Sequence, residues 1–262
     1  MDEKSAYGTD KNAPYTCQRV STPIRVDGNL DKAVWKEAVC LPSFADKTSG
    51  RRALFETRAS MLWDDTALYV SFRMEDRDVW STREAPVTRS WMENTVQVSI
   101  AGPGAHYELM VNALGETYEI FYIWKDAYQR GGRYDIPEFD LAVHRPLVLG
   151  GDAGLDSRGM RWVFFHWNYP GLQTGVRVGG TLEDRRDIDT GWTVELALPW
   201  DGITRLMDGN VPPRVGDRWE IGLSRNQIID QRASFYQAVW LPYPVGDQDA
   251  RHPTCIPDVV FG

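Results

Sequence analysis

The chain has 262 residues, of which 42% are hydrophobic and 25% charged, a composition typical of soluble globular proteins. Its formal net charge of −8 argues against nucleic acid or an anionic membrane as a partner, because neither would be attracted electrostatically. No apolar stretch approaches the length of about 20 residues that spans a bilayer. Neutral or cationic ligands fit this charge better.

An all-β unit of this length is commonly one domain, so we expect residues 16–262 to form a single domain after a polar leader over residues 1–15. The first five residues contain no apolar segment resembling a signal peptide. This leaves open a cytosolic protein and a protein whose signal has been removed. Of these, we expect a secreted protein, periplasmic or extracellular.

Three cysteines, Cys17, Cys40 and Cys255, make an odd number without C-x-x-C spacing. They therefore indicate neither a disulfide framework nor a zinc site, and we expect buried free thiols. The histidines lack H-x-x-x-H spacing, and the chain has no G-x-S-x-G elbow or glycine-rich phosphate loop. These absences favour binding over catalysis.

The first predicted elements are a short strand over residues 16–20 and an edge strand over 24–28. A helix follows, with Asp31 as its N-cap and an apolar stripe that includes Trp35, and it ends before Pro42. Period-two alternation then predicts hairpins joining 56–63 to 67–74 and 94–100 to 106–113, and a third adjacent strand over 117–124.

Residues 125–160 are rich in Gly, Pro and Asp and predict a long surface excursion with one or two short elements. Strands are expected again at 161–166, 175–180, 191–198, 217–227, 236–240 and 257–261, with a helical turn over 200–207. Many short strands and almost no long helix predict an all-β, jelly-roll-like fold, a two-sheet antiparallel β-sandwich.

Eleven tryptophans are more than a sandwich core of this size needs. Indole is well suited to lie against the C–H face of a sugar ring, because it offers apolar area and loses little entropy. Surplus tryptophan therefore points to carbohydrate, although large aromatics also dominate cores and we expect about two thirds of these residues to be structural.

Six blocks of sequence resemble, in order, the motifs of the family 9 carbohydrate-binding modules and their relatives. They cover most of the chain from about residue 16 to 261 and comprise Val26–Trp35 (V-D-G-N-L-D-K-A-V-W), Leu62–Asp65 with Ala67–Val70, Trp91–Gln97, Tyr107–Leu109 with Val111–Ala113, Asp189–Trp200, and Gly216–Trp219 with Ser224–Arg225.

The resemblance implies a β-sandwich and non-catalytic sugar binding, by modules attached to or working beside polysaccharide-degrading enzymes such as glycoside hydrolases. In sugar-binding members two tryptophans clamp the ring, and Trp91 resembles the first. Near the second, around residues 250–253, this chain has no aromatic side chain. Gln97 stands where the family has a carboxylate, and Met110 where it has an arginine.

Alternation predicts one polar face on the hairpin of residues 94–113. Val96, Val98 and Ile100 share the core face, so Gln97 lies on the outer face together with Glu108 and Asn112. A carboxylate and two amides near an indole suit sugar hydroxyls, each of which offers a donor and an acceptor. The alternative is a solvated sheet face.

Further candidate ligand-binding residues are Trp124, Tyr128, Arg225 and Trp240. Trp124 and Tyr128 begin the long excursion with Arg130 and Tyr134, and they either replace the missing stacking aromatic or pack beneath their own loop. Trp240 ends a late strand, where a core position is the commoner one.

Three alternatives remain open from the residues. A glycosidase needs only two carboxylates, for which Glu93, Glu108 and Glu116 are candidates. A haem-binding electron-transfer domain would use Met110 and His106, although no second axial ligand is evident. No cofactor is expected to be required, but the turn aspartates at 64, 65, 76 and 78 either hold a structural calcium ion or are solvated.

Overall fold

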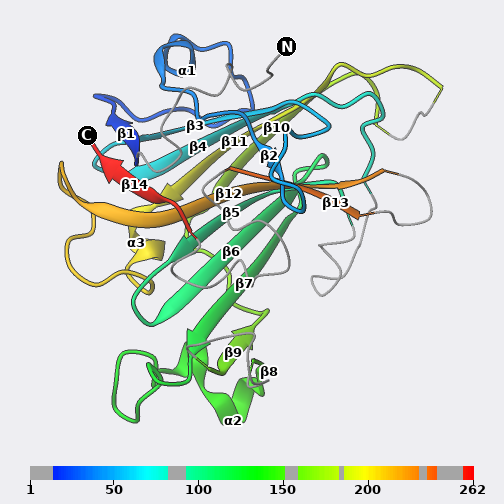
Figure 1. Cartoon of the computed structure of the whole chain (residues 1–262). Coiled ribbons are helices and arrows are strands. Elements are labelled where there is room, and N and C mark those ends of the chain that lie inside the picture. Colours follow the sequence, from blue (N-terminus) through cyan, green and yellow to red (C-terminus); the bar gives the residue numbers. More distant parts are fainter. Residues whose placement is uncertain (1–13, 82–92, 151–158, 183–185, 230–234, 241–255) are drawn as a thin grey trace.

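Short strands account for most of the secondary structure, and they form two layers that pack face to face (Figure 1). The computed structural model describes residues 14–81, 93–150, 159–182, 186–229, 235–240 and 256–262. The β-sandwich predicted from the sequence is confirmed.

The first layer, called sheet I, carries the strands of the predicted hairpin 56–74 in its centre. All its pairings are antiparallel except that of β1 with β3. In spatial order it consists of β10 (Gln173–Gly179), β11 (Gly191–Pro199), β4 (Ala67–Met74), β3 (Thr57–Trp63) and the second half of β1 (Tyr15–Arg19).

The second layer, called sheet II, contains the three adjacent strands predicted over residues 94–124. In spatial order it consists of the first half of β1, β14 (Asp258–Phe261), β12 (Arg218–Ile228), β5 (Thr95–Ala101), β6 (Ala105–Asn112), β7 (Thr117–Trp124), β9 (Arg161–Phe164) and β8 (Leu147–Leu149), with β13 (Phe235–Val239) on β12 and β2 (Ala45–Asp46) on β13.

Strand β1 departs from the purely antiparallel arrangement that we expected. Its residues Tyr15–Cys17 pair in parallel with β14 of sheet II, and Gln18 and Arg19 pair in parallel with β3 of sheet I. One five-residue strand thus belongs to both sheets, which makes the combined sheet mixed. Hairpin signals in the sequence cannot reveal such pairing, because its partners are remote in the chain.

The main core lies between the two sheets and is built from alternate residues of each strand. Sheet I contributes side chains such as Phe72 and Leu196, and sheet II contributes side chains such as Val98 and Leu109. Of the eleven tryptophans, Trp91 lies outside the described residues, Trp80 and Trp162 are half-buried, and the remaining eight are buried. Most of the tryptophans are therefore buried, in line with the expectation that about two thirds are structural.

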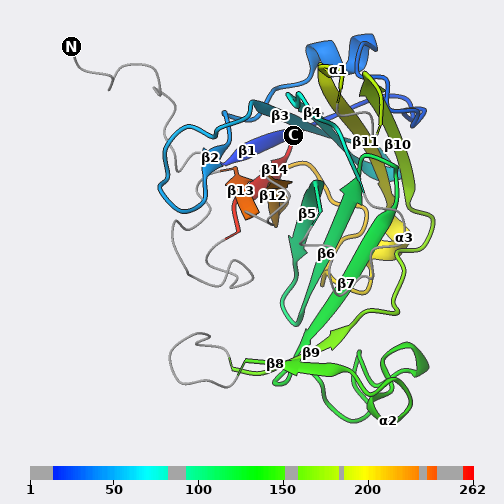
Figure 2. The ribbon, with the colours of Figure 1, turned by 90° about the vertical axis from the view of Figure 1, so that its right-hand side faces the viewer.

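The predicted first helix is present as α1 (Ala33–Glu37), which lies over sheet I (Figures 1 and 2). Its cap differs from the expectation, since Lys32 occupies the N-cap position and Asp31 instead pairs with Arg73 of β4. The segment 24–28 is not a strand, because its backbone amides bind a side chain of sheet I. Trp35 packs on the outer face of this sheet in a second apolar cluster.

The long excursion lies at the end of the sandwich farthest from α1 (Figures 1 and 2). It contains the 3₁₀ helix η3 (Pro137–Phe139), helix α2 (Leu141–His144) and strand β8. The helical turn expected over 200–207 is α3 (Trp200–Ile203). No helix in the described ranges is long and apolar enough to cross a membrane.

The cysteines only partly meet the expectation. Cys17 is a buried free thiol, and burial raises its pKa, whereas Cys40 is free but exposed. Cys255 lies outside the described residues.

Candidate ligand-binding face

The outer face of sheet II carries the polar residues that alternation placed together. Cross-strand register puts Gln97 opposite Met110, Ser99 opposite Glu108, and Thr95 opposite Asn112. Because the inner face of the same strands is apolar, the shared face of Gln97, Glu108 and Asn112 is confirmed. The face is not solvated as the alternative required, since Gln97 is only 8% and Glu108 only 4% exposed.

One end of this face is a hydrogen-bonded cluster around Asn112. Its amide nitrogen donates to Glu93 Oε2 at 3.2 Å and to Glu116 Oε2 at 2.9 Å. The hydroxyl of Tyr118 donates to the same oxygen of Glu93 at 3.2 Å. Burial, followed by the nearby carboxylates of Glu93 and Glu116, raises the pKa of Tyr118. The phenol therefore stays protonated and acts as a donor.

The other end of the face centres on Glu108. Its Oε2 accepts a hydrogen bond from the Tyr122 hydroxyl at 2.9 Å, and its Oε1 lies 3.3 Å from His106 Nε2. Tyr122 also contacts Arg161, whose guanidinium lies 5.7 Å from the centre of the ring. Phenol, imidazole and carboxylate thus form a connected polar group on adjacent strands.

Three buried polar atoms of this face have no hydrogen-bond partner among the described residues: Glu93 Oε1, Asn226 Oδ1 and His106 Nδ1. Asn226 belongs to the face because it pairs with Thr95 in register and donates to its hydroxyl at 3.1 Å. An unsatisfied buried polar atom costs on the order of 1–3 kcal/mol, so such atoms call for an explanation. A buried water molecule or a ligand that donates hydrogen bonds would provide one.

Two candidate aromatics at the start of the excursion are both packed within the protein. Trp124 lies on the outer face of sheet II, opposite Arg161 in register, with the guanidinium 5.0 Å from its ring centre, and it is 1% exposed. Tyr128 packs against the main core, and its hydroxyl donates to the carbonyl of Phe139 at 2.9 Å. The excursion therefore packs its own aromatics beneath itself.

Arg225 and Trp240, two further candidates, lie between the sheets and away from the outer face. The Arg225 guanidinium is buried and pairs with Asp76 Oδ2 at 3.3 Å. Burial lowers the pKa of Arg225 to about 10 and raises that of Asp76. Trp240 packs edge-on against Tyr15 in the core. Trp91, the predicted stacking residue, lies outside the described residues.

The family-like motifs have a structural role in sheet I. Glu195 of β11 is fully buried and accepts hydrogen bonds from the backbone amides of Asp27 and Gly28, from the indole of Trp35 at 2.7 Å and from Lys32 Nζ at 2.7 Å. This one carboxylate fastens the V-D-G-N-L-D segment and α1 to the sheet. Gly28 has φ +74°, and a Cβ there would lie 2.8 Å from the backbone of Val176.

The turn aspartates considered for calcium have protein partners. Asp64 accepts from the Thr66 and Ala67 amides and from the Tyr69 hydroxyl, and Asp76 pairs with Arg225. Among the described residues no group of three or more His, Cys, Asp or Glu side chains could hold a metal ion. The structural calcium ion stays a prediction.

Sequence reasoning missed Tyr118 and Tyr122 as members of the face. A signal was present, because residues 118, 120, 122 and 124 alternate along β7 with the inward-facing Phe121 and Ile123. The apolar members Met110, Ile120 and Val163 accompany the tyrosines in a small outer cluster. The face therefore combines aromatic and polar surface, as a saccharide requires.

A comparison with protein families finds one match within this sandwich. Residues 26–119 match the family described as carbohydrate family 9 binding domain-like. The resemblance drawn from the motifs is confirmed over these residues. The matched region extends from the segment fastened by Glu195 to the third strand of the polar face.

Solved structures support the same fold. A family 9 carbohydrate-binding module from Caldicellulosiruptor kristjanssonii in complex with cellotriose is 13% identical, with a TM-score of 0.55, and the match covers 94% of this chain and 93% of the other. A second structure with the same description, in complex with glucose, is 13% identical, with a TM-score of 0.54, and the match covers 95% of this chain and 94% of the other. A candidate carbohydrate-binding protein of Bacteroides uniformis is 10% identical, with a TM-score of 0.64 and coverages of 95% and 100%. No curated protein matches the chain.

Proposed function

We propose that the protein is a non-catalytic carbohydrate-binding module that recognises a saccharide on the outer face of sheet II. The observation that carries the proposal is the set of buried polar atoms of this face that lack a partner, Glu93 Oε1, Asn226 Oδ1 and His106 Nδ1. Sugar hydroxyls donate hydrogen bonds to such atoms and accept them from neighbouring donors. The family match and the cellotriose and glucose complexes of similar structures support the same ligand class.

The geometry also fits a chain of sugar residues better than a single small molecule. The unsatisfied atoms lie toward opposite ends of β5 and β6, with Asn226 beside Thr95 and His106 opposite Ala101. A strand rises about 3.3 Å per residue, so the face extends for roughly 20 Å along the strands. Aromatic side chains from β7 lie beside the polar row.

The way the carboxylates are used supports binding without catalysis. Glu93 and Glu116 accept hydrogen bonds from the same amide nitrogen of Asn112, and Glu108 accepts from Tyr122. A glycosidase instead separates its acid and its base or nucleophile across the scissile bond. An accessory role in polysaccharide degradation, in a secreted location and beside glycoside hydrolases, is part of the proposal and rests on the family resemblance.

Substitution of Gln97 tests the face directly. Gln97→Met keeps the side-chain volume but removes the amide, so we expect it to weaken saccharide binding by about 1–3 kcal/mol. Calorimetric titration with cellotriose and a panel of oligosaccharides measures this change. Gln173→Met, an exposed position on β10 of the other sheet, is the matched control and should bind like wild type.

Two results would contradict the proposal. One is a folded wild type that binds no member of the panel. The other is equal binding by the two glutamine variants and wild type, which would place the saccharide elsewhere. Release of reducing sugar by the wild type, abolished in Glu108→Gln, would make the protein an enzyme.

A further inference from the structure

A row of arginines crosses the outer face of sheet I, on the side of the molecule opposite to the polar face of sheet II. Register places Arg58 of β3 opposite Arg73 of β4, Arg73 opposite Thr193 of β11, and Thr193 opposite Arg177 of β10. Neighbouring strands lie about 4.8 Å apart, so the backbone positions of the three arginines lie within roughly 15 Å. Like charges directly opposite each other are destabilising, which makes the row unusual in a chain of net charge −8.

Each arginine of the row has an acidic partner. Arg58 pairs with Glu56 at 2.6 Å, and Arg73 pairs with Asp31 at 3.2 Å. Arg177 lies 3.6 Å from Asp27, which Lys32 also approaches to 2.9 Å. Each guanidinium has five N–H donors in a planar fork, and these contacts are made from one edge of it. The arginine side chains remain 52–66% exposed, so their other donors face solvent.

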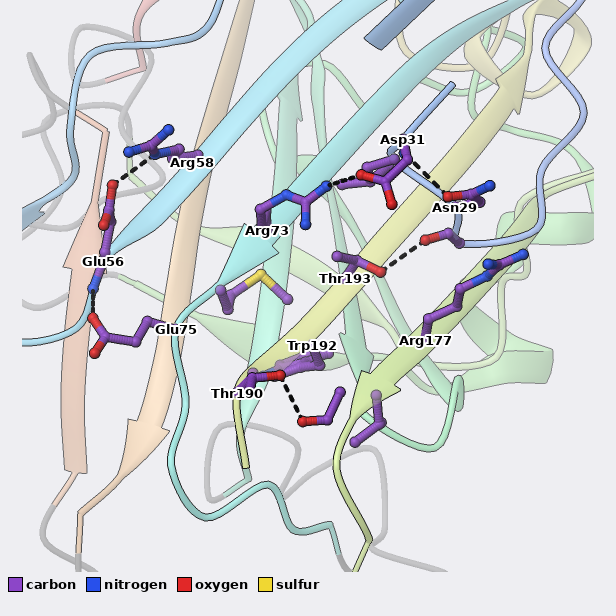
Figure 3. A pocket seen from close by; sticks show the side chains of 16 residues that line it. Asn29, Asp31, Glu56, Arg58, Arg73, Glu75, Arg177, Thr190, Trp192 and Thr193 are labelled. Carbon is purple, nitrogen blue, oxygen red and sulfur yellow. Dashed lines mark hydrogen bonds and ion pairs between the residues drawn. The ribbon is translucent and has the colours of Figure 1, made fainter. Parts of the chain in front are cut away.

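The row lines a cavity of about 460 Å³ that is open to solvent (Figure 3). The segment Gly28–Asp31 forms one wall, and the ends of β4 and β11 with Thr190 and Trp192 form another. Thr193 lies between Arg73 and Arg177, and its hydroxyl donates to the carbonyl of Gly28 at 2.7 Å. The wall is held in place by the buried carboxylate of Glu195, so the cavity is preformed.

Its lining sets the chemistry of an occupant. Arginine forks bind a carboxylate with two parallel hydrogen bonds. The cavity also carries carboxylates at Asp31, Glu56 and Glu75 and an amide at Asn29, which accept hydrogen bonds from hydroxyl groups. These carboxylates repel a doubly charged phosphate or sulfate more strongly than a ligand that has one negative charge, and they suit a ligand with several hydroxyls.

We propose that this cavity is a second saccharide site, selective for a sugar residue that carries a carboxylate, a uronic acid. Arg73 and Arg177 bind the carboxylate, and Asn29, Asp31 and Thr193 receive the ring hydroxyls. The inference rests on the proposed function in one respect only, that the natural ligand is a glycan. With two sites on opposite faces, the module binds a neutral chain on sheet II and an acidic residue on sheet I.

Calorimetric titration of the full chain with trigalacturonate and with a glucuronate-containing disaccharide tests the proposal. We expect at least one to bind, its methyl ester to bind at least tenfold more weakly, and inorganic sulfate not to compete. Arg73→Gln and Arg177→Gln should each weaken uronate binding at least tenfold. Arg73→Lys should also weaken it, because an ammonium group lacks the fork.

The control is Arg205→Gln, which removes an arginine of similar exposure that pairs with Glu138 on the excursion and should change nothing. Absence of uronate binding, equal affinity for acid and ester, or competition by sulfate would overturn the proposal. Loss of uronate binding in Gln97→Met but not in Arg73→Gln would move the acidic ligand to sheet II. Cellotriose titrations of the same variants show separately whether the neutral site exists.

Discussion

Glu220 of β12 faces a second carboxylate, Asp258 of β14, directly across the strand pair. Burial, followed by the charge of Asp258, raises the pKa of Glu220 from its ordinary value of 4.5 to about 7. Arg218, on the same strand, lies 3.8 Å from Asp258 and relieves the repulsion only in part. Glu220 is thus a carboxyl group that takes up a proton close to neutral pH.

Such a group makes the free energy of unfolding depend on pH. A folded-state pKa above the unfolded value favours the native state at low pH, and that stabilisation is lost as the pH rises from 4.5 to about 7. After allowance for solvent screening, we expect a change on the order of 1 kcal/mol. Urea denaturation at pH 5 and pH 8 measures it, and Glu220→Gln should remove the dependence. An unchanged pH profile in this variant would assign the effect to other groups.

Residue-level prediction from the sequence succeeded where alternation alone decides the face. It placed Gln97, Glu108 and Asn112 together, and the same rule applied to Trp219, Ile221 and Leu223 would have put Arg225 on the inner face. What the sequence could not provide is the partner, because Asp76 lies 149 positions from Arg225 in the chain. A buried charge at an inner position was the available signal for such a partner.

At the level of elements, residues 24–38 show how one side chain can organise a segment that has little regular structure of its own. Helix α1 has five residues and no side-chain cap, so it is too short to be stable by itself. The carboxylate of Glu195 holds it instead through the indole of Trp35, and it holds the preceding turn through the amides of Asp27 and Gly28. The sequence predicted a helix here and misassigned both the cap and the preceding strand, since the decisive acceptor comes from β11.

Substitution of Glu195 should therefore loosen this whole segment. Glu195→Gln replaces one acceptor oxygen by an NH₂ group, which cannot accept hydrogen bonds from the surrounding donors. It also removes the negative charge that pairs with Lys32. We therefore expect a loss of about 2–4 kcal/mol in the free energy of unfolding. Chemical denaturation measures it, and hydrogen exchange should show lost protection of the amides of Asp27 and Gly28. Glu37→Gln, on the exposed side of α1, is the control. Equal stability of the two variants would be inconsistent with this role.

For the whole molecule, most of the strands followed from the sequence, whereas β2 and the way the two layers are joined did not. Hairpins between neighbouring strands are local and have turn signals. The parallel pairings of β1, and the ion pair of Arg225 with Asp76 between sheet II and sheet I, join residues that are remote in the chain. These contacts determine how the layers sit on each other.

The ion pair between the sheets can be tested by a double-mutant cycle. Arg225→Met leaves the buried carboxylate of Asp76 without its cation, so we expect a loss of about 3–5 kcal/mol. Asp76→Asn added to Arg225→Met should recover part of this loss, because no buried charge then remains. Urea denaturation of the four proteins measures the coupling. Strict additivity of the two substitutions would show that the pair does not act as a unit.

The position of β1 between the sheets also determines how the sandwich would respond to tension. In the parallel pair, the beginning of β1 lies beside Val259 and its third residue beside Phe261, so the start of one strand and the end of the other point in opposite directions. A pull applied through these two ends loads the hydrogen bonds between them together, along the strands, and does not open them one after another. A module held at both ends would thus bear force through β1, the strand that belongs to both sheets.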